Sequence, residues 1–133
     1  MRRFFFKTLL ALLCANFAAK AAPSTNWPMF RGDAALLGVS SDVLPQKTLL
    51  LWKFKTGAPV KSSAVIGDGK VFVGSDDMSI YALDFKTGKK IWSYKTTGAV
   101  EAPGLFANGK LFIGSTDGFF YALDANSGKL LWK

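Results

Sequence analysis

The stretch ALDFKTGKKIW, residues 82–92, recurs forty residues later as ALDANSGKLLW, residues 122–132. Both copies belong to a longer ungapped repeat, in which residues 53–92 align with residues 93–132 and sixteen of the forty aligned positions are identical. A period of about 40–45 residues is the size of one four-stranded β-propeller blade. The repeat therefore predicts an all-β fold with two consecutive β-propeller blades, each of four antiparallel strands.

Turn residues divide each repeat into four short apolar runs, which is the pattern of four strands. The expected strands are residues 63–66, 71–75, 80–84, 91–95, 104–106, 111–115, 119–124 and 130–133. Several runs are continuously apolar, and this indicates sheets that are covered on both faces by neighbouring blades. A two-sheet sandwich with its own aromatic core is the alternative, but it leaves the ungapped repeat unexplained.

A third tryptophan extends the period upstream, since Trp52 lies forty residues before Trp92. Residues 50–56 therefore match the fourth strand of a third blade, an orphan strand whose first three companions are missing. The predicted organisation is a signal peptide, a lead-in segment, the outer strand of an incomplete blade, blade 1 and blade 2, at residues 1–21, 22–49, 50–60, 61–97 and 98–133.

Two blades alone do not make a closed ring, because propellers close with about four to eight blades. An open pair would leave apolar faces and strand edges exposed. We therefore expect the chain to be a fragment of a longer propeller, with the remaining blades in missing sequence. The alternative is a natural short chain that completes a ring from several copies of itself.

The first 21 residues are typical of a secretory signal peptide. Three basic residues precede an apolar stretch that includes residues 9–13, and Ala19 and Ala21 provide small residues for cleavage. The apolar stretch is too short to span a bilayer, which takes about 20 residues. A packed N-terminal helix is the alternative. The sequence thus predicts a periplasmic or secreted protein that is cleaved near Ala21.

The composition excludes several kinds of site. The chain contains no histidine, the commonest metal ligand and the usual general base at neutral pH. Its one cysteine, Cys14, lies in the predicted signal, so the mature chain has no disulfide or thiolate metal site. From Ala22 onward, 13 basic and 9 acidic residues leave a charge of +4. The basic residues are dispersed, which favours solvated loops over nucleic-acid binding.

Two glycines, Gly74 and Gly114, occupy the same mid-strand position of the two repeats. Glycine weakens a strand unless a neighbour must approach its backbone closely. We expect a large ring of the adjacent blade to lie there, supplied by Trp92 or Trp132.

Residues 82–92 resemble the tryptophan-docking motif of the PQQ-like β-propeller repeat, in which Ala, Asp, Thr, Gly and Trp recur at this spacing. The opening NWPMFRGD, residues 26–33, is similar to the start of exported propellers of this group. The motif positions are Ala82, Asp84, Thr87, Gly88 and Trp92 in the first copy, and Ala122, Asp124, Ser127, Gly128 and Trp132 in the second.

The resemblance implies that these residues join blades together. Asp84 can accept hydrogen bonds from the turn that it enters, and Thr87 can add a hydroxyl bond. Gly88 can take the positive φ that the reversal requires, and Trp92 can lay its ring against the next blade. These are structural positions rather than catalytic ones.

The resemblance also implies two classes of function. The family includes quinoprotein dehydrogenases, which hold pyrroloquinoline quinone (PQQ) and calcium over the propeller axis. It also includes cofactor-free binding scaffolds similar to the outer-membrane assembly lipoprotein BamB. A quinoprotein needs an aspartate base and a series of oxygen ligands for calcium. Most aspartates here occupy turn positions, including the adjacent pair Asp76 and Asp77, and Glu101 is expected in a solvated loop.

We therefore expect an exported scaffold for binding or assembly in the cell envelope, with no cofactor in this chain and no catalytic or metal residue assigned. A protein partner would contact the loops at residues 57–59 and 98–100. No nucleic acid and no transmembrane span are expected. The alternative is the N-terminal part of a PQQ-dependent dehydrogenase, whose PQQ and calcium are held by blades absent here.

Overall fold

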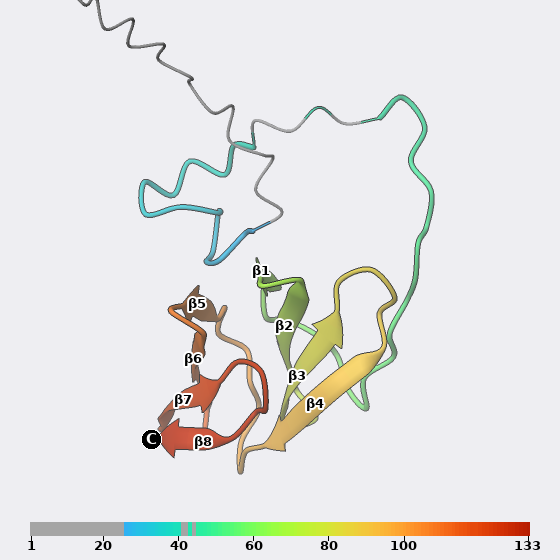
Figure 1. Cartoon of the computed structure of the whole chain (residues 1–133). Helices are drawn as coiled ribbons and strands as arrows, with labels where there is room; N and C mark the ends of the chain where they lie inside the picture. Colours follow the sequence, from blue (N-terminus) through green and yellow to red (C-terminus); the bar gives the residue numbers. More distant parts are fainter. Residues whose placement is uncertain (1–25, 41–42, 44) are drawn as a thin grey trace, which may run out of the picture.

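The computed structural model describes residues 26–40, 43 and 45–133, so the predicted signal peptide lies outside the described residues. The described chain forms two four-stranded antiparallel sheets with strand orders β1-β2-β3-β4 and β5-β6-β7-β8 (Figure 1). The strands are β1 Val65–Gly67, β2 Lys70–Ser75, β3 Ser79–Asp84, β4 Lys90–Lys95, β5 Leu105–Ala107, β6 Lys110–Gly114, β7 Phe120–Asp124 and β8 Leu130–Trp132. In this part of the chain no helix is long and apolar enough to cross a membrane.

The two sheets confirm the predicted all-β class and the two consecutive blades of four antiparallel strands. Their registers match at the forty-residue period: Phe72 pairs with Ala82 in the first sheet, and Phe112 pairs with Ala122 in the second. The first strand of blade 1 is shorter than expected, since β1 has three residues; β5 has the expected three residues but begins one residue later.

The first hairpin of each blade is set by a two-residue turn. Asp68 and Gly69 have φ values of 48° and 69°, and Asn108 and Gly109 have values of 50° and 69°. Two consecutive left-handed residues form the type I′ turn, whose twist suits a β-hairpin and which favours Asp-Gly and Asn-Gly. The turn chemistry therefore fixes the register of β1 on β2 and of β5 on β6.

The predicted orphan strand at residues 50–60 is not a strand in the structure. Its exposure nevertheless alternates, since Trp52 and Phe54 are half-buried while Lys53 and Lys55 are exposed. Phe54 meets Tyr81 of β3 edge to face, with ring centroids 5.3 Å apart. A strand is defined by its hydrogen-bonded neighbour, and within the described residues this segment has no strand beside it.

The core joins the two blades and combines aliphatic side chains with a group of aromatic rings. Phe72 of β2 is 1% exposed and lies between Trp92, at 5.9 Å, and Phe106 of the next blade, at 5.7 Å between ring centroids. Phe106 can approach because Gly67 has no side chain; a Cβ there would stand 2.1 Å from the ring. Such contacts stabilise the pair of blades through burial and ring packing.

The predicted contact at the mid-strand glycines is wrong. The side chain and carbonyl of Val100, from the loop that enters blade 2, lie against Gly74, where a Cβ would stand 2.3 Å from Val100 Cγ1. Gly114 has only Ala102 and Phe120 nearby, each 3.7 Å from the position of a Cβ. The glycine still permits a close approach, but the group that approaches is a loop residue rather than a tryptophan.

We predict that Phe72→Ala lowers the free energy of unfolding by about 3–5 kcal/mol, because it leaves a large cavity between the blades. The matched control is Phe112→Ala, which removes the same ring from the equivalent position, where it is only half-buried. The control should cost clearly less, because its site can collapse or fill with water. Urea unfolding followed by circular dichroism measures both changes, and equal losses would contradict the packing described.

Candidate functional site

The turn between β3 and β4 is held by one carboxylate. Asp84 Oδ1 accepts hydrogen bonds from the Thr87 amide at 2.8 Å and from the Thr87 hydroxyl at 2.7 Å. The Gly88 amide donates to the Asp84 carbonyl at 2.8 Å, and Gly88 has a φ of 67°. The second copy repeats this geometry, with Ser127 in place of the threonine and the same distances to Asp124 Oδ1.

These hydrogen bonds lower the pKa of both carboxyl groups. For Asp84 the largest cause is the hydroxyl of Thr87, and for Asp124 it is the hydroxyl of Ser127. A carboxylate with a lowered pKa is a weaker base, so the chemistry of these groups suits a structural turn rather than proton transfer.

Trp52 and Trp92 each dock on the turn of the following repeat. Trp52 lies over Gly88 and donates its indole N–H to the Phe85 carbonyl at 2.9 Å. Trp92 lies over Gly128 and donates to the Ala125 carbonyl at 3.0 Å. A Cβ on either glycine would stand 2.4 or 2.6 Å from the indole ring. The predicted motif residues therefore do not form one site per repeat. The turn of the first copy docks with Trp52, and the turn of the second copy docks with Trp92 of the first copy.

The remaining motif residues lie beside these sites. Ala82 and Ala122 are fully buried and pair across the sheet with Trp92 and Trp132. Trp132 is 50% exposed and packs against Phe112 and Phe120 of its own blade. Within the described residues Trp132 has no glycine turn beneath its ring.

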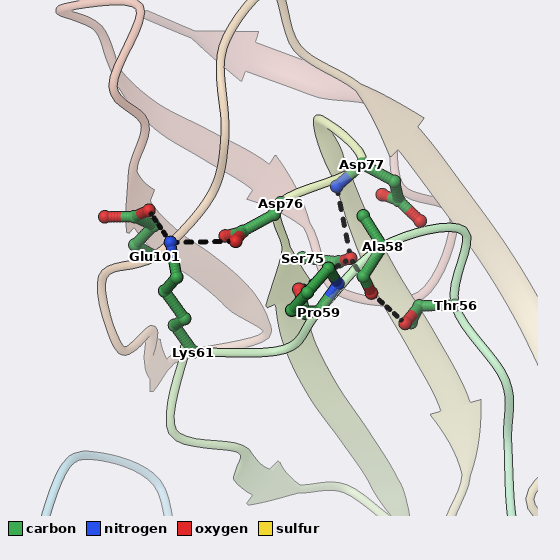
Figure 2. A network of polar contacts seen from close by, with 8 residues as sticks. All are labelled: Thr56, Ala58, Pro59, Lys61, Ser75, Asp76, Asp77 and Glu101. Carbon is green, nitrogen blue, oxygen red and sulfur yellow. Dashed lines mark hydrogen bonds and ion pairs between the residues drawn. The ribbon is translucent and has the colours of Figure 1, made fainter.

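A second repeated cluster lies where the chain enters each blade, and Figure 2 shows the copy in blade 1. The hydroxyl of Ser75 contacts the carbonyls of Ala58 and Pro59 at 3.2 and 3.3 Å. Asp77 Oδ2 accepts hydrogen bonds from the Gly57 amide at 2.8 Å and from the Tyr81 hydroxyl at 2.6 Å. The loop at residues 57–59 is thereby attached to the sheet.

Blade 2 contains the same cluster. Ser115 contacts the carbonyls of Gly98 and Ala99, both at 3.2 Å. Asp117 Oδ2 accepts from the Thr97 amide at 3.0 Å and from the Tyr121 hydroxyl at 2.7 Å. The two loops predicted to bind a partner therefore have a fixed backbone conformation in this structure.

Sequence reasoning missed this cluster, although its signal is present. Ser, Asp and Tyr recur at the same spacing in both repeats, as Ser75, Asp77 and Tyr81 and again forty residues later. The sequence pattern predicts turns for these aspartates but does not show that each accepts a hydrogen bond from the tyrosine four residues later.

The pKa of Asp77 is lowered by its surroundings. Burial alone would raise it, but the hydrogen bonds from the Tyr81 hydroxyl and the Gly57 amide outweigh that effect. The pKa of Asp117 is lowered in the same way, against burial, with Tyr121 as the main donor. Burial and the neighbouring carboxylate raise the pKa of Tyr121 to about 12.

A group of three charges, in which Lys61 and Glu101 are exposed and Asp76 is half-buried, connects the two blades (Figure 2). Lys61 Nζ lies 2.9 Å from Asp76 Oδ2 and 2.7 Å from Glu101 Oε1. The hydrogen bond to Glu101, followed by that to Asp76, raises the pKa of Lys61. Lys61 and Glu101 occupy the same position of the two repeats, so consecutive blades contribute opposite charges at one end. Exposed pairs of this kind contribute little to stability.

The carboxylates of the described residues do not form a metal site. No group of three or more Cys, Asp or Glu side chains that could hold an ion occurs among them. Asp76 Oδ1 and Asp77 Oδ1 are buried without a hydrogen-bond partner. The two carboxyl groups point in opposite directions, however, one toward Lys61 and the other away from it (Figure 2), so they do not share a ligand.

We predict that Gly88→Ala costs more stability than Gly69→Ala. The two glycines have nearly equal φ values of 67° and 69°, so alanine at either meets left-handed strain of about 1–2 kcal/mol. At Gly88 the new Cβ collides with the Trp52 ring, whereas at Gly69 no atom lies within 4 Å of the new Cβ. We expect the collision to add about 1–3 kcal/mol. Thermal unfolding and Trp52 fluorescence measure the difference, and equal melting temperatures would contradict the docking contact.

We also predict a pH-dependent effect of Tyr81→Phe, which removes the hydroxyl donor of Asp77. A carboxyl with a lowered folded pKa stabilises the fold above its unfolded pKa of about 3.9, and this contribution is lost as the pH falls through the folded value. The variant should therefore lose about 1.5 kcal/mol at pH 7 and progressively less below about pH 3.

The control for that measurement is Tyr94→Phe, because the hydroxyl of Tyr94 makes no hydrogen bond within the described residues. Urea unfolding at several pH values measures both variants. A loss in Tyr81→Phe that is independent of pH would show that the hydroxyl does not act through the charge of Asp77.

Comparison with known proteins places the chain among propellers. The profile of the family described as outer membrane protein assembly factor BamB matches residues 43–133. Among curated proteins no relative matches the sequence. The structure is similar to BamB from Moraxella catarrhalis, with a TM-score of 0.57 and 25% identity over 62% of this chain and 26% of that protein.

Two dehydrogenases are also similar. A europium-containing methanol dehydrogenase has a TM-score of 0.68 and 29% identity over 80% of this chain and 22% of its own. The quinohemoprotein alcohol dehydrogenase from Comamonas testosteroni has a TM-score of 0.69 and 28% identity over 86% of this chain and 20% of its own. The chain thus spans about a quarter or less of each of these three proteins. By its repeat, its two blades and the family profile that covers most of it, the chain belongs to the BamB family of PQQ-like β-propeller repeat proteins.

Proposed function

We propose that the protein is an exported binding or assembly scaffold of the cell envelope. The observation that carries this proposal is the match of both blades to the family described as outer membrane protein assembly factor BamB. A scaffold of this kind binds a partner through loops and strand edges that the propeller holds in place. The predicted signal peptide supports a location in the periplasm.

The geometry of the entry loops supports a binding role. Their backbones are tied to the sheets by Ser75, Asp77 and the equivalent residues of blade 2. A loop that is already ordered loses little entropy when a partner binds. Lys61 and Glu101 lie exposed beside these loops, where they can contribute to recognition of a protein partner.

The second candidate is the N-terminal part of a PQQ-dependent dehydrogenase. It is favoured by the similarity to the two dehydrogenases, one of them a quinohemoprotein, which extends over more of this chain than the similarity to the solved BamB structure. Within the described residues the carboxylates do not form a set of calcium ligands. This candidate therefore requires that the residues holding PQQ and calcium lie elsewhere in the protein.

We predict that deleting the gene in its host lowers the abundance of outer-membrane β-barrel proteins, because their assembly loses a scaffold. Quantitative mass spectrometry of isolated outer membranes measures the change, and the wild-type gene supplied in trans should restore it. Unchanged outer-membrane composition would contradict an assembly role.

A parallel assay distinguishes the second candidate. The full-length protein is purified and incubated with PQQ and calcium, and with PQQ and a chelator as the control. The scaffold proposal expects no bound quinone absorption and no dye-linked oxidation of alcohols. Calcium-dependent appearance of both would favour the dehydrogenase instead.

A further inference from the structure

The lead-in peptide is hydrogen-bonded to the innermost strands of both blades. Trp27 exchanges two backbone hydrogen bonds with Ile66 of β1, at 2.9 and 2.8 Å. The carbonyl of the next residue, Pro28, accepts from the amide of Phe106 in β5 at 2.7 Å. In Figure 1 this segment, in blue, lies at the end of the molecule where β1 and β5 meet.

The two strand positions involved are equivalent, since Ile66 and Phe106 are separated by one forty-residue period. Successive residues of the lead-in thus contact the same point on successive blades. Both β1 and β5 are edge strands of their sheets, so their outer N–H and C=O groups have no other strand beside them within the described residues. An unpaired edge is a site where an extended chain can add.

The lead-in is folded on itself as well as bound to the blades. The Gly32 amide donates to the Met29 carbonyl at 2.9 Å, and the Gly38 amide donates to the Arg31 carbonyl at 3.1 Å. Gly32 has a φ of 88°, and a Cβ there would stand 2.9 Å from the Trp27 ring. The local turns and the ring contact therefore hold Trp27 and Pro28 in the conformation that reaches both strands.

Other links between the blades lie elsewhere. The hydroxyl of Ser62 donates to the Ala102 carbonyl at 2.8 Å, and Lys61 contacts Glu101 on the entry loops. Neither of these two links involves the outer backbone groups of β1 and β5, which are bonded to Trp27 and Pro28 of the lead-in. The lead-in is thus a separate connection between the two blades.

We propose that residues 26–38 form a strap that couples the two blades through the edges of β1 and β5 and that opens as a unit. When the strap is released, the backbone groups of Ile66 and Phe106 become accessible together, although they belong to different sheets. When it is bound, it fixes the inner edges relative to each other and prevents another extended chain from adding to either.

Native-state amide exchange of the whole chain, resolved by NMR, tests this coupling. The amides of Trp27, Ile66 and Phe106 should exchange with one common opening free energy and one common dependence on denaturant, because a single opening exposes all three. The amides of Asp76 and Thr116, which donate to Pro59 and Ala99 in the entry loops, serve as references outside the strap. Different opening free energies for Ile66 and Phe106 would overturn the proposal.

A pair of variants provides a second test. Gly32→Ala collides with the Trp27 ring, whereas Gly38→Ala introduces similar left-handed strain, at a φ of 67°, without a contact closer than 3.8 Å. Gly32→Ala should lower protection at Ile66 and Phe106 by the same factor, about tenfold or more relative to Gly38→Ala. Loss of protection at Ile66 with Phe106 unchanged would overturn the proposal. If Gly32→Ala fails to fold, the wild-type measurement decides alone.

Discussion

The arrangement of the blades depends on the docking of a tryptophan onto the glycine turn of the following repeat. For Trp92 this contact has three requirements: Gly128 must lack a side chain, the Ala125 carbonyl must face the indole N–H, and Asp124 must hold the turn in shape. The indole is the largest apolar group available, and its N–H needs a partner when buried. One side chain thus fixes both the distance and the orientation of the next sheet, and the Phe72 core fills the space that results.

The features that were predicted from the sequence are those that a residue type determines locally. The turn pairs that begin with Asp68 and Asn108 need left-handed backbone, which few residues tolerate, so turn residues of this kind marked the boundaries between the predicted strands. The hydrogen bonds of Asp84 and Thr87 are equally local, because they lie within one turn. The forty-residue period then placed the strands, and the family resemblance indicated which residues lie at the joints between blades.

The contacts between segments that are distant in sequence could not be predicted in the same way. Continuous apolar strands reveal that both faces are covered but not which residue covers them, and so the neighbour of Gly74 was expected to be a tryptophan and is Val100. The Ser75, Asp77 and Tyr81 cluster joins a loop to two strands, and the bonds between Trp27 and Ile66 of β1 connect residues that are 39 positions apart. Neither set of contacts can be found from sequence spacing alone, because each depends on how the chain folds in three dimensions. Residues 50–60 do not form a strand for a related reason, because a strand exists only together with a hydrogen-bonded neighbour.

The direction of the tryptophan contact has a consequence for how such a chain can change in evolution. Each repeat provides a tryptophan that docks on the following repeat and a glycine turn that receives the tryptophan of the preceding repeat. The two sides of each contact are therefore different. A forty-residue window that does not cut a turn therefore contains one complete donor and one complete acceptor. Duplication or loss of a whole window restores every joint without a compensating substitution, whereas an insertion of any other length into a blade breaks one. The docking contact thereby favours the gain or loss of whole forty-residue units over other changes in length.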